Sequence, residues 1–396
     1  MKVIKYLLYL LFTPIWYLQL MLPRNKNIWI FGAWAGKRYS DNTRAFFTYI
    51  VETKPDIQAI WLSRNNNIVS RLRNEGLRSY NINSLQGIYY SLRAKYVFIC
   101  FGKRDVNPFF INGAISVDFW HGVPLKKICN DDKFSQITPL KRKLIKVFFP
   151  FVYEFNIDFH ISTASIFDPI IKSAFLIEEE QIISSGYPRN DIYFKTEKEL
   201  PFIAKLKEEY DNPTIVAYLP THRGALVEDV DYFEKYDFKY EKFNTYLNER
   251  NHLFIYKNHF VVHNELKTTS SSQDRIIQIS NDDIDDHLNL FLKSVDILIT
   301  DYSGVYFDFL LTERPIIFAA FDLDEYISSN RELYFDYNEI ACGPIAKNWD
   351  EVLAAIENLN SDDQYKESRH NYNTLFNKYI DSRNCERVYR ALIEKS

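Results

Sequence analysis

Short apolar segments recur along this chain, and each one ends at a turn rich in glycine, proline or polar residues. Between them the pattern is helical, as at 68–74 and 305–312. Short apolar strands that alternate with helices form parallel sheets joined by right-handed crossovers. The sequence therefore predicts an α/β fold built from doubly wound, Rossmann-type sheets. The predicted strands are 27–31, 58–62, 96–100, 115–120 and 158–162, and then 214–219, 253–257, 276–279, 296–300 and 315–319.

A break in this alternation divides the chain. The charged amphipathic stretch 197–210 is followed by Asp-Asn-Pro at 211–213, after which the strand pattern starts again. A chain of 396 residues is long enough for two domains, each with its own core. We expect an N-terminal α/β domain over 25–205 and a second over 206–348, facing each other across a cleft, with closing helices over 349–396.

The first 24 residues form a separate element. Residues 3–22 are almost wholly apolar and aromatic, and no small-residue cleavage site follows them. This length is barely enough to span a bilayer, and the tyrosines and tryptophan suit a helix lying in the membrane surface. We expect a membrane-associated helix over 1–24, a peripheral or monotopic anchor on the cytoplasmic face of the membrane. A true span and a soluble packing helix are the alternatives.

A second segment favours the same surface. Residues 141–146 are mostly basic and run into the phenylalanine-rich stretch 147–155. Basic residues beside aromatic ones suit an anionic membrane surface or a pyrophosphate-lipid acceptor. An ordinary solvated helix face explains the same pattern.

Charge and composition exclude several classes of function. The net charge is −4, which argues against nucleic acid as the main partner. The four cysteines are far apart and form no CxxC pair, so neither a zinc site nor a disulfide framework is expected. The chain carries no GxSxG, HExxH, Walker A or GxGxxG motif. We interpret the acidic run 282–286 as a helix start, and we expect no metal and no required cofactor.

The most informative stretch is WHGVPLK at 120–126, which follows a predicted strand. Side chains at the carboxyl ends of strands in α/β sheets face the ligand crevice. A neutral His121 at that position can take a proton from a hydroxyl near neutral pH. Gly122 lets a ligand approach closely, and Lys126 can hold a phosphate. The alternative is a buried histidine that is hydrogen-bonded to the backbone.

Three loops of the second predicted domain carry phosphate-binding side chains at strand ends. Arginine and lysine bind phosphate oxygens, and free N–H groups at a helix start attract an anion. Plain helix capping explains the last of these loops equally well. Their convergence on one sheet edge predicts a site for a nucleotide diphosphate. The candidates are Thr221 and Arg223, Lys257 and His259, and Thr300, Asp301, Ser303 and Gly304, with Arg189 completing the clamp near the domain junction.

In this order, the segments resemble the CDP-glycerol glycerophosphotransferases of teichoic acid synthesis. The resemblance covers most of the chain after residue 24. It implies a GT-B-type fold, a CDP-glycerol or CDP-ribitol donor, and a hydroxyl of an undecaprenyl-linked saccharide or growing polymer as acceptor. It also implies that the enzyme works at the cytoplasmic face of the bacterial cell membrane, on the inner membrane surface. It is carried by FGxWxGKxYSDN at 31–42, WHGxPLK at 120–126, GYPRND at 186–191, PTxR at 220–223, KxH at 257–259 and TDYSxVxFD at 300–308.

The resemblance also implies roles for single residues. His121 would act as general base on the acceptor hydroxyl, and His259 would stabilise the β-phosphate or protonate the leaving CMP. Positioned cations suffice to expel CMP, a good leaving group, without a required metal. Arg223, Thr300 and Ser303 would hold the phosphates or the nucleotide of the donor. The residues expected on the acceptor side are Asp41, Asn42, Gly122 and Lys126.

The chain departs from the family pattern at a few positions. Gly304 stands where a second serine is usual, Phe260 follows His259 where proline is common, and His222 stands where an aromatic residue is frequent. The long N-terminal region of polymerising members is absent, which favours a primase-like or single-addition enzyme. A GT-B glycosyltransferase that uses a nucleotide sugar and an inactive scaffold of a surface-polymer complex are the alternatives.

Overall fold

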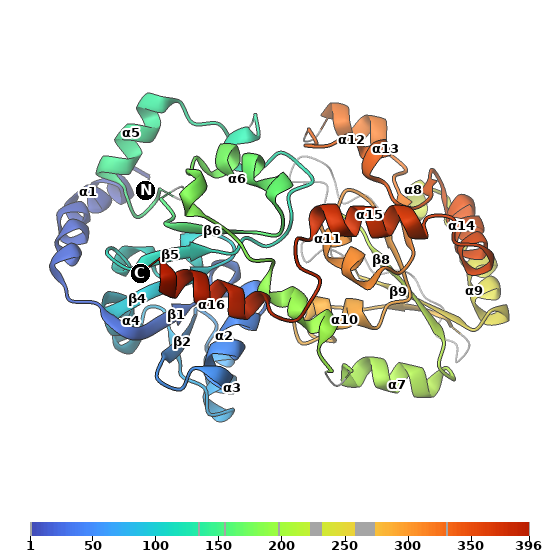
Figure 1. The fold of residues 1–396 in the computed structure, drawn as a ribbon, viewed down its shortest axis with the longest axis horizontal. Coiled ribbons are helices and arrows are strands. Elements are labelled where there is room, and N and C mark those ends of the chain that lie inside the picture. The colour runs from blue at the N-terminus through green and yellow to red at the C-terminus, as the bar shows by residue number, and fades with distance from the viewer. Residues whose placement is uncertain are drawn as a thin grey trace. The chain divides into compact units, whose positions relative to one another are not determined.

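The computed structural model describes residues 2–133, 135–153, 156–196, 199–221, 232–257, 274–329 and 332–395. Over these ranges the chain forms two compact units, each a parallel sheet with helices packed on it (Figure 1). Unit 1 comprises Met1–His121, Ile128–Asp191 and Asp381–Ser396, and unit 2 comprises Gly122–Lys127 and Ile192–Ile380.

Unit 1 contains a 7-stranded parallel sheet in the order β3-β2-β1-β4-β5-β6-β7. The direction of winding reverses between β1 and β4, as in a Rossmann sheet, and ligands bind beside the carboxyl ends of strands at such a switch point. The strands are β1 (Asn25–Phe31), β2 (Gln58–Ser63), β3 (Ser79–Asn81), β4 (Ala94–Ile99), β5 (Ile115–Asp118), β6 (Phe159–Ser162) and β7 (Ile182–Ser184). The helices are α1 (Lys2–Leu18), α2 (Asp41–Thr53), α3 (Asn66–Asn74), α4 (Leu85–Arg93), α5 (Pro139–Phe148), α6 (Asp168–Phe175) and α16 (Asn384–Glu394).

Unit 2 repeats this plan with a 6-stranded parallel sheet in the order β10-β9-β8-β11-β12-β13. Its switch point lies between β8 and β11. The strands are β8 (Thr214–Leu219), β9 (His252–Tyr256), β10 (Ile276–Gln278), β11 (Ile297–Thr300), β12 (Ile316–Ala319) and β13 (Ile345–Ala346). The helices are α7 (Pro201–Glu209), α8 (Tyr232–Lys235), α9 (Tyr240–Glu249), α10 (Leu288–Lys293), α11 (Val305–Phe309), α12 (Leu323–Ser329), α13 (Tyr337–Ile340), α14 (Trp349–Ser361) and α15 (Lys366–Phe376).

The predicted α/β class and its two Rossmann-type sheets are confirmed. The short strands β3, β7 and β13 were not predicted, because two or three residues give no periodic signal. The helix expected over 305–312 is α11 followed by a 3₁₀ turn, Leu310–Thr312.

The compact units divide the chain elsewhere than at the expected domain boundaries. The main segment of unit 2 begins at Ile192, where the sequence predicts 206, and the closing segment 349–396 is split between the units. Helices α14 and α15 belong to unit 2, whereas α16 belongs to unit 1. The carboxylate of Asp191 accepts the backbone N–H groups of Asn384 and Cys385, at 2.8 and 3.0 Å. These bonds satisfy N–H groups of the first turn of α16 and fix the helix to unit 1.

The core of unit 1 is strongly aromatic. Phe31 and Phe98, on adjacent strands, stack with ring centroids 4.6 Å apart, and Trp29 lies 4.8 Å from Tyr96. All four side chains are buried. Each large side chain removed from water contributes about 1.5–3 kcal/mol. This packing holds the carboxyl ends of β1, β4 and β5 in a fixed arrangement.

The predicted N-terminal helix is present as α1, and one of its faces packs on unit 1. The Thr13 hydroxyl donates to the Phe148 carbonyl at 2.6 Å, the Trp16 indole donates to Pro108 at 3.2 Å, and the rings of Phe12 and Phe109 lie 5.2 Å apart. Within the part of the chain that the structure describes, no helix has the length and apolar character needed to cross a bilayer. The contact of α1 with a membrane stays a prediction.

Candidate active site

His121 lies just beyond β5 and is partly buried among three aromatic rings. Its ring centroid is 5.4 Å from that of Trp34, 5.2 Å from Phe101 and 4.2 Å from Trp120. Burial lowers the pKa of His121 below its ordinary value, so the imidazole is neutral at pH 7. Its Nδ1 lies 3.2 Å from the Cys100 carbonyl oxygen, which can only accept a hydrogen bond. Nδ1 therefore carries the proton, and Nε2 has a lone pair with which to accept one.

A strained turn presents this histidine. Trp120 has a left-handed backbone with φ of 55°, which is uncommon for a residue with a side chain. The carboxylate of Asp118 accepts the Trp120 N–H at 2.9 Å, and the amide of Asn42 donates to the Trp120 carbonyl at 3.1 Å. Both backbone polar groups of the strained residue are thus held, which keeps His121 in one position.

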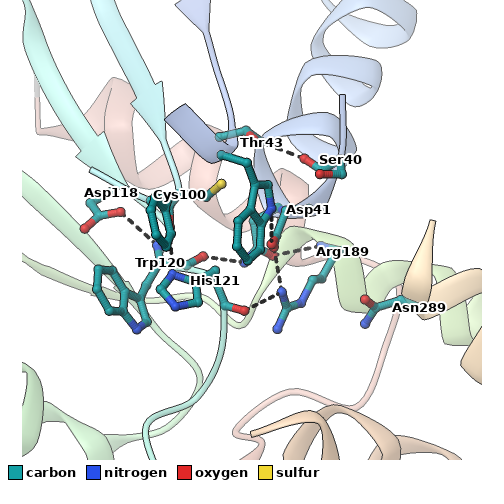
Figure 2. Close-up of polar contacts among 12 residues, drawn as sticks. Ser40, Asp41, Thr43, Cys100, Asp118, Trp120, His121, Arg189 and Asn289 are labelled. Carbon is teal, nitrogen blue, oxygen red and sulfur yellow. Dashed lines mark hydrogen bonds and ion pairs between the residues drawn. The ribbon is translucent and has the colours of Figure 1, made fainter. Parts of the chain in front are cut away.

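Three of the sequence motifs, at 31–42, 120–126 and 186–191, meet at His121 within unit 1. Nη1 of Arg189 donates to Asp41 Oδ1 at 2.6 Å and to the His121 carbonyl at 2.9 Å (Figure 2). The Arg189 N–H also donates to the Asn42 side-chain oxygen at 3.2 Å. The structure thus brings the predicted residues Asp41 and Asn42 to His121. Arg189, predicted for the donor phosphates, is ion-paired here with Asp41, and its contact with a donor stays a prediction.

Asp105 was not predicted, although it holds two of the loops beside His121. Its carboxylate accepts the N–H groups of Cys100, Phe101 and Ala35, at 2.7, 2.7 and 2.6 Å. Burial raises the pKa of Asp105 to about 7, although the three hydrogen bonds favour its charged form. The neighbouring Gly32 has no space for a side chain, because a Cβ would collide with the Asp105 carbonyl oxygen. That close approach explains why the motif at 31–42 has a glycine at position 32.

In unit 2, the predicted donor-binding loops meet at the carboxyl ends of β8 and β11. The Thr300 hydroxyl donates to the Leu219 carbonyl at 2.9 Å, and both carboxylate oxygens of Asp301 accept the Thr221 N–H, at 2.9 and 3.1 Å. Ser303 Oγ accepts the Val305 N–H at 3.3 Å, at the start of α11. Thr300 and Asp301 are buried, so in the described structure they tie the two loops together.

Lys257 lies at the end of β9, beside β8, where its N–H donates to the Tyr218 carbonyl at 3.1 Å. The structure therefore places Thr221, Lys257, Thr300, Asp301 and Ser303 on neighbouring strand ends of one sheet, as the sequence predicts. Arg223 and His259 lie outside the described residues.

Gly122 and Lys126 pack with unit 2 and not with the unit that carries His121. A Cβ at Gly304 would come within 2.6 Å of the Val123 carbonyl oxygen, so this loop lies directly on the start of α11. Lys126 forms an isolated antiparallel bridge with Leu333, and its Nζ is 5.7 Å from the centre of the Tyr326 ring. The division between the units falls between His121 and Gly122.

Comparison with known proteins assigns the family. A sequence profile described as CDP-glycerol:poly(glycerophosphate) glycerophosphotransferase matches residues 15–394. The chain belongs to this family. The resemblance stated from the motifs is confirmed, and the chain is a CDP-glycerol glycerophosphotransferase-like enzyme of teichoic acid biosynthesis. The family description names a CDP-activated donor, which leaves the nucleotide-sugar alternative without support.

Named relatives include polymerases and a transferase. The chain is 31% identical over 354 residues to the teichoic acid poly(glycerol phosphate) polymerase of Bacillus spizizenii, covering 85% of this chain and 84% of that protein. It is 27% identical over 382 residues to the teichoic acid glycerol-phosphate transferase of Staphylococcus aureus, covering 93% and 94%. A polymerase and a transferase both match over most of their length, so the extent of the match does not distinguish one addition from many.

The fold has a counterpart among solved structures. The wall teichoic acid polymerase TagF superimposes with a TM-score of 0.76 and 23% identity, covering 94% of this chain and 89% of that chain. In the ranges that the structure describes, no cluster of three or more His, Cys, Asp or Glu side chains could hold a metal ion.

Proposed function

We propose that this enzyme transfers glycerol phosphate from CDP-glycerol to a hydroxyl of an undecaprenyl-linked saccharide or growing surface polymer, and releases CMP. The observation that carries the proposal is the state of His121. It is neutral, its Nδ1 proton is committed to the Cys100 carbonyl, and its Nε2 can accept a proton. A general base at neutral pH needs this combination.

The proposed reaction is a single displacement at phosphorus. The acceptor hydroxyl gives its proton to Nε2 of His121 while its oxygen bonds to the β-phosphorus of CDP-glycerol. The bond from that phosphorus to the bridging oxygen breaks, and CMP leaves with the bonding electrons. Lys257, Arg223 and His259 would neutralise the charge on the phosphates, and His259 is the candidate to protonate the departing CMP. No metal or other cofactor is required in this scheme.

Product analysis tests this proposal. The purified full chain is incubated with CDP-glycerol or CDP-ribitol and defined undecaprenyl-linked saccharides. Released CMP is measured by chromatography, and the lipid product by mass spectrometry. We expect CMP with CDP-glycerol and a product heavier by one or more glycerol phosphate units. CMP with CDP-ribitol alone would change the donor, and ribitol-phosphate polymerases do match part of this chain. Absence of CMP with both donors across the acceptors would refute the proposal.

The enzyme is also proposed to work at the cytoplasmic face of the membrane, docked through the outer faces of α1 and α5. Both faces expose large apolar side chains, including Leu11 (73% exposed) and Leu140 (70% exposed). Helix α5 adds four basic residues to its leucines. Apolar side chains flanked by basic ones match the headgroup region of an anionic bilayer. The docking helices are Lys2–Leu18 and Pro139–Phe148.

Vesicle binding checks the docking surface. The double variant Leu11→Glu/Leu144→Glu places two carboxylates on it, and we expect at least a tenfold weaker binding to vesicles of phosphatidylglycerol and phosphatidylcholine, because each leucine contributes about 1.5–3 kcal/mol when buried. Sedimentation with vesicles gives the bound fraction. Leu85→Glu on α4, a leucine of the same unit that is more exposed than either of these two, is the control and should bind as the wild type does. Equal binding of all three proteins would contradict this surface.

A further inference from the structure

We infer that Trp34, Arg38, Arg64, Phe101 and Arg104 form a binding site for the phosphate-bearing end of the acceptor. We call these five residues the aromatic–arginine patch. The inference rests on the proposed function, because it takes His121 as the group that activates the acceptor hydroxyl. It adds the part of the enzyme that would recognise the acceptor next to that hydroxyl.

The patch is built on a strained loop. Trp34, Ala35 and Gly36 are three consecutive residues with left-handed backbones, with φ of 50°, 55° and 74°. A left-handed residue other than glycine costs about 1–2 kcal/mol. Backbone strain of this kind persists only where the surroundings hold it, and it clusters at functional sites. The strain of residues 34–36 therefore indicates a functional loop.

Several hydrogen bonds hold the loop in this shape. The Ala35 N–H donates to the Asp105 carboxylate, and the Gly36 carbonyl accepts from the Ser63 hydroxyl at 2.7 Å and from the Arg64 N–H at 2.6 Å. Nε of Arg64 also donates to the Ala35 carbonyl at 3.2 Å. The same Asp105 carboxylate fixes the loop that carries Phe101. The two loops of the patch thus share one buried support.

The supported loops present an aromatic shelf beside His121. The Trp34 and Phe101 rings stack with centroids 5.1 Å apart and an interplanar angle of 19°, and both lie within 5.5 Å of the His121 ring centroid. Phe101 keeps 46% of its surface exposed. A stacked aromatic pair that remains open to solvent suits the C–H face of a sugar or polyol. A hydroxyl of that ligand would then lie close to the imidazole.

Arginine side chains lie beside the shelf, while the Trp34 indole N–H donates to the Asp41 carboxylate at 3.2 Å. The Arg38 guanidinium lies 5.4 Å from the centre of the Trp34 ring, and Arg64 and Arg104 are both exposed. Burial lowers the pKa of Arg64, and so does the nearby charge of Arg104. Asp105, the acid that follows Arg104 in the sequence, turns its carboxylate inward to three backbone N–H groups. Two neighbouring guanidinium groups favour a ligand with a phosphate, which arginine binds through two parallel hydrogen bonds.

A ligand with a polyol hydroxyl next to a phosphate satisfies both halves of the patch. Two parts of an acceptor have this chemistry: the phosphodiester at the end of a growing glycerol phosphate polymer, and the diphosphate of a lipid-linked saccharide. Separate arms of the test distinguish these two sources.

The test compares charged and neutral acceptors. Transfer from CDP-glycerol is measured with glycerophosphoglycerol, with diglycerol, which lacks the phosphate, and with an undecaprenyl diphosphate disaccharide. The variant is Arg64→Gln/Arg104→Gln, and the matched control is Arg390→Gln, an exposed arginine on α16. We expect the double variant to raise the KM for a phosphate-bearing acceptor about tenfold or more, since hydrogen bonds to charged groups are the strong ones. The KM for CDP-glycerol and the hydrolysis of CDP-glycerol by water should not change, because neither involves the acceptor. A small fall in kcat would reflect the lost support of the loop by Arg64.

The possible outcomes distinguish the two kinds of acceptor, and they distinguish failure of the patch from failure of the proposed function. A raised KM for glycerophosphoglycerol assigns the patch to the polymer end, and a raised KM for the diphosphate lipid alone assigns it to the lipid. The same KM as wild type for both acceptors overturns the inference. A parallel loss of CDP-glycerol hydrolysis overturns it too, because the arginines would then act on the donor or on folding. If the wild type transfers nothing, the proposed function has failed. In that case saturation-transfer NMR tests ligand binding to the patch directly. We expect glycerophosphoglycerol to bind more strongly than diglycerol, and we expect this difference to disappear in the Arg64→Gln/Arg104→Gln variant.

Discussion

Replacing His121 with glutamine is expected to lower the kcat for CMP release by at least a hundredfold, the effect of removing a general base. CDP-glycerol should still bind, because the predicted donor residues other than Arg189 belong to the other unit of the chain. Chromatography of released CMP gives the rate, and titration calorimetry with CDP-glycerol gives the binding. His370→Gln is the control, since that histidine is exposed in unit 2. Wild-type turnover in His121→Gln would remove this residue as the base.

The pH profile of the wild type gives an independent check on His121. Burial among aromatic rings lowers the pKa of this imidazole, whereas the charge of Asp41 raises it. The base works only when neutral, so kcat/KM should fall only on the acid side of the ordinary histidine value of about 6.5. A fall that begins above that value would mean that another group controls the reaction.

Replacing Asp105 with alanine is expected to destabilise unit 1 by about 3 kcal/mol at pH 6 and to lower kcat at least tenfold, because three backbone N–H groups lose their acceptor and misplaced catalytic groups are costly. These N–H groups belong to Ala35, Cys100 and Phe101, in the two loops beside His121. Denaturant unfolding followed by tryptophan fluorescence gives the stability. Asp105→Asn keeps an oxygen acceptor without a charge and should fall between the wild type and Asp105→Ala.

The same residue should make stability depend on pH. The pKa of Asp105 is about 7 in the folded protein against an ordinary value of 3.8, so the folded state keeps a proton that the unfolded state releases. Stability from this group is therefore full below about pH 4 and is lost as the pH rises towards 7. Asp105→Ala and Asp105→Asn should both lack this part of the slope. Wild-type stability in Asp105→Ala, or a slope that persists in both variants, would contradict the role given to this carboxylate.

The fold could be predicted largely from local patterns. An apolar strand such as β8 or β11 must be buried on both faces, and its alternation with helices leaves a parallel sheet as the arrangement that buries it. The same logic places His121 and Thr300 at strand ends, because each follows an apolar run. The short strands were missed for the converse reason, since Ser79–Asn81 is paired only because its neighbour β2 is already in place.

The site was predictable in its members but not in its connections. Asp41 and His121 belong to motifs that the sequence displays, and the structure brings them together. The sequence did not indicate that Arg189 ion-pairs with Asp41, since 148 positions separate them. Asp105 follows Lys103 and Arg104 and has the pattern of an ordinary charged turn. Only its burial and its three backbone donors reveal its role.

The sequence alone determined the class of fold, the family and the position of the candidate base at the end of a strand. These properties depend on residue type and on short-range periodicity, both of which are written along the chain. The tertiary structure decided that α16 returns to unit 1, that Gly122 and Lys126 pack with unit 2, and that one buried carboxylate supports the loops around His121. Such features arise from hydrogen bonds and close contacts between distant segments, and packing brings those segments together without leaving a local pattern.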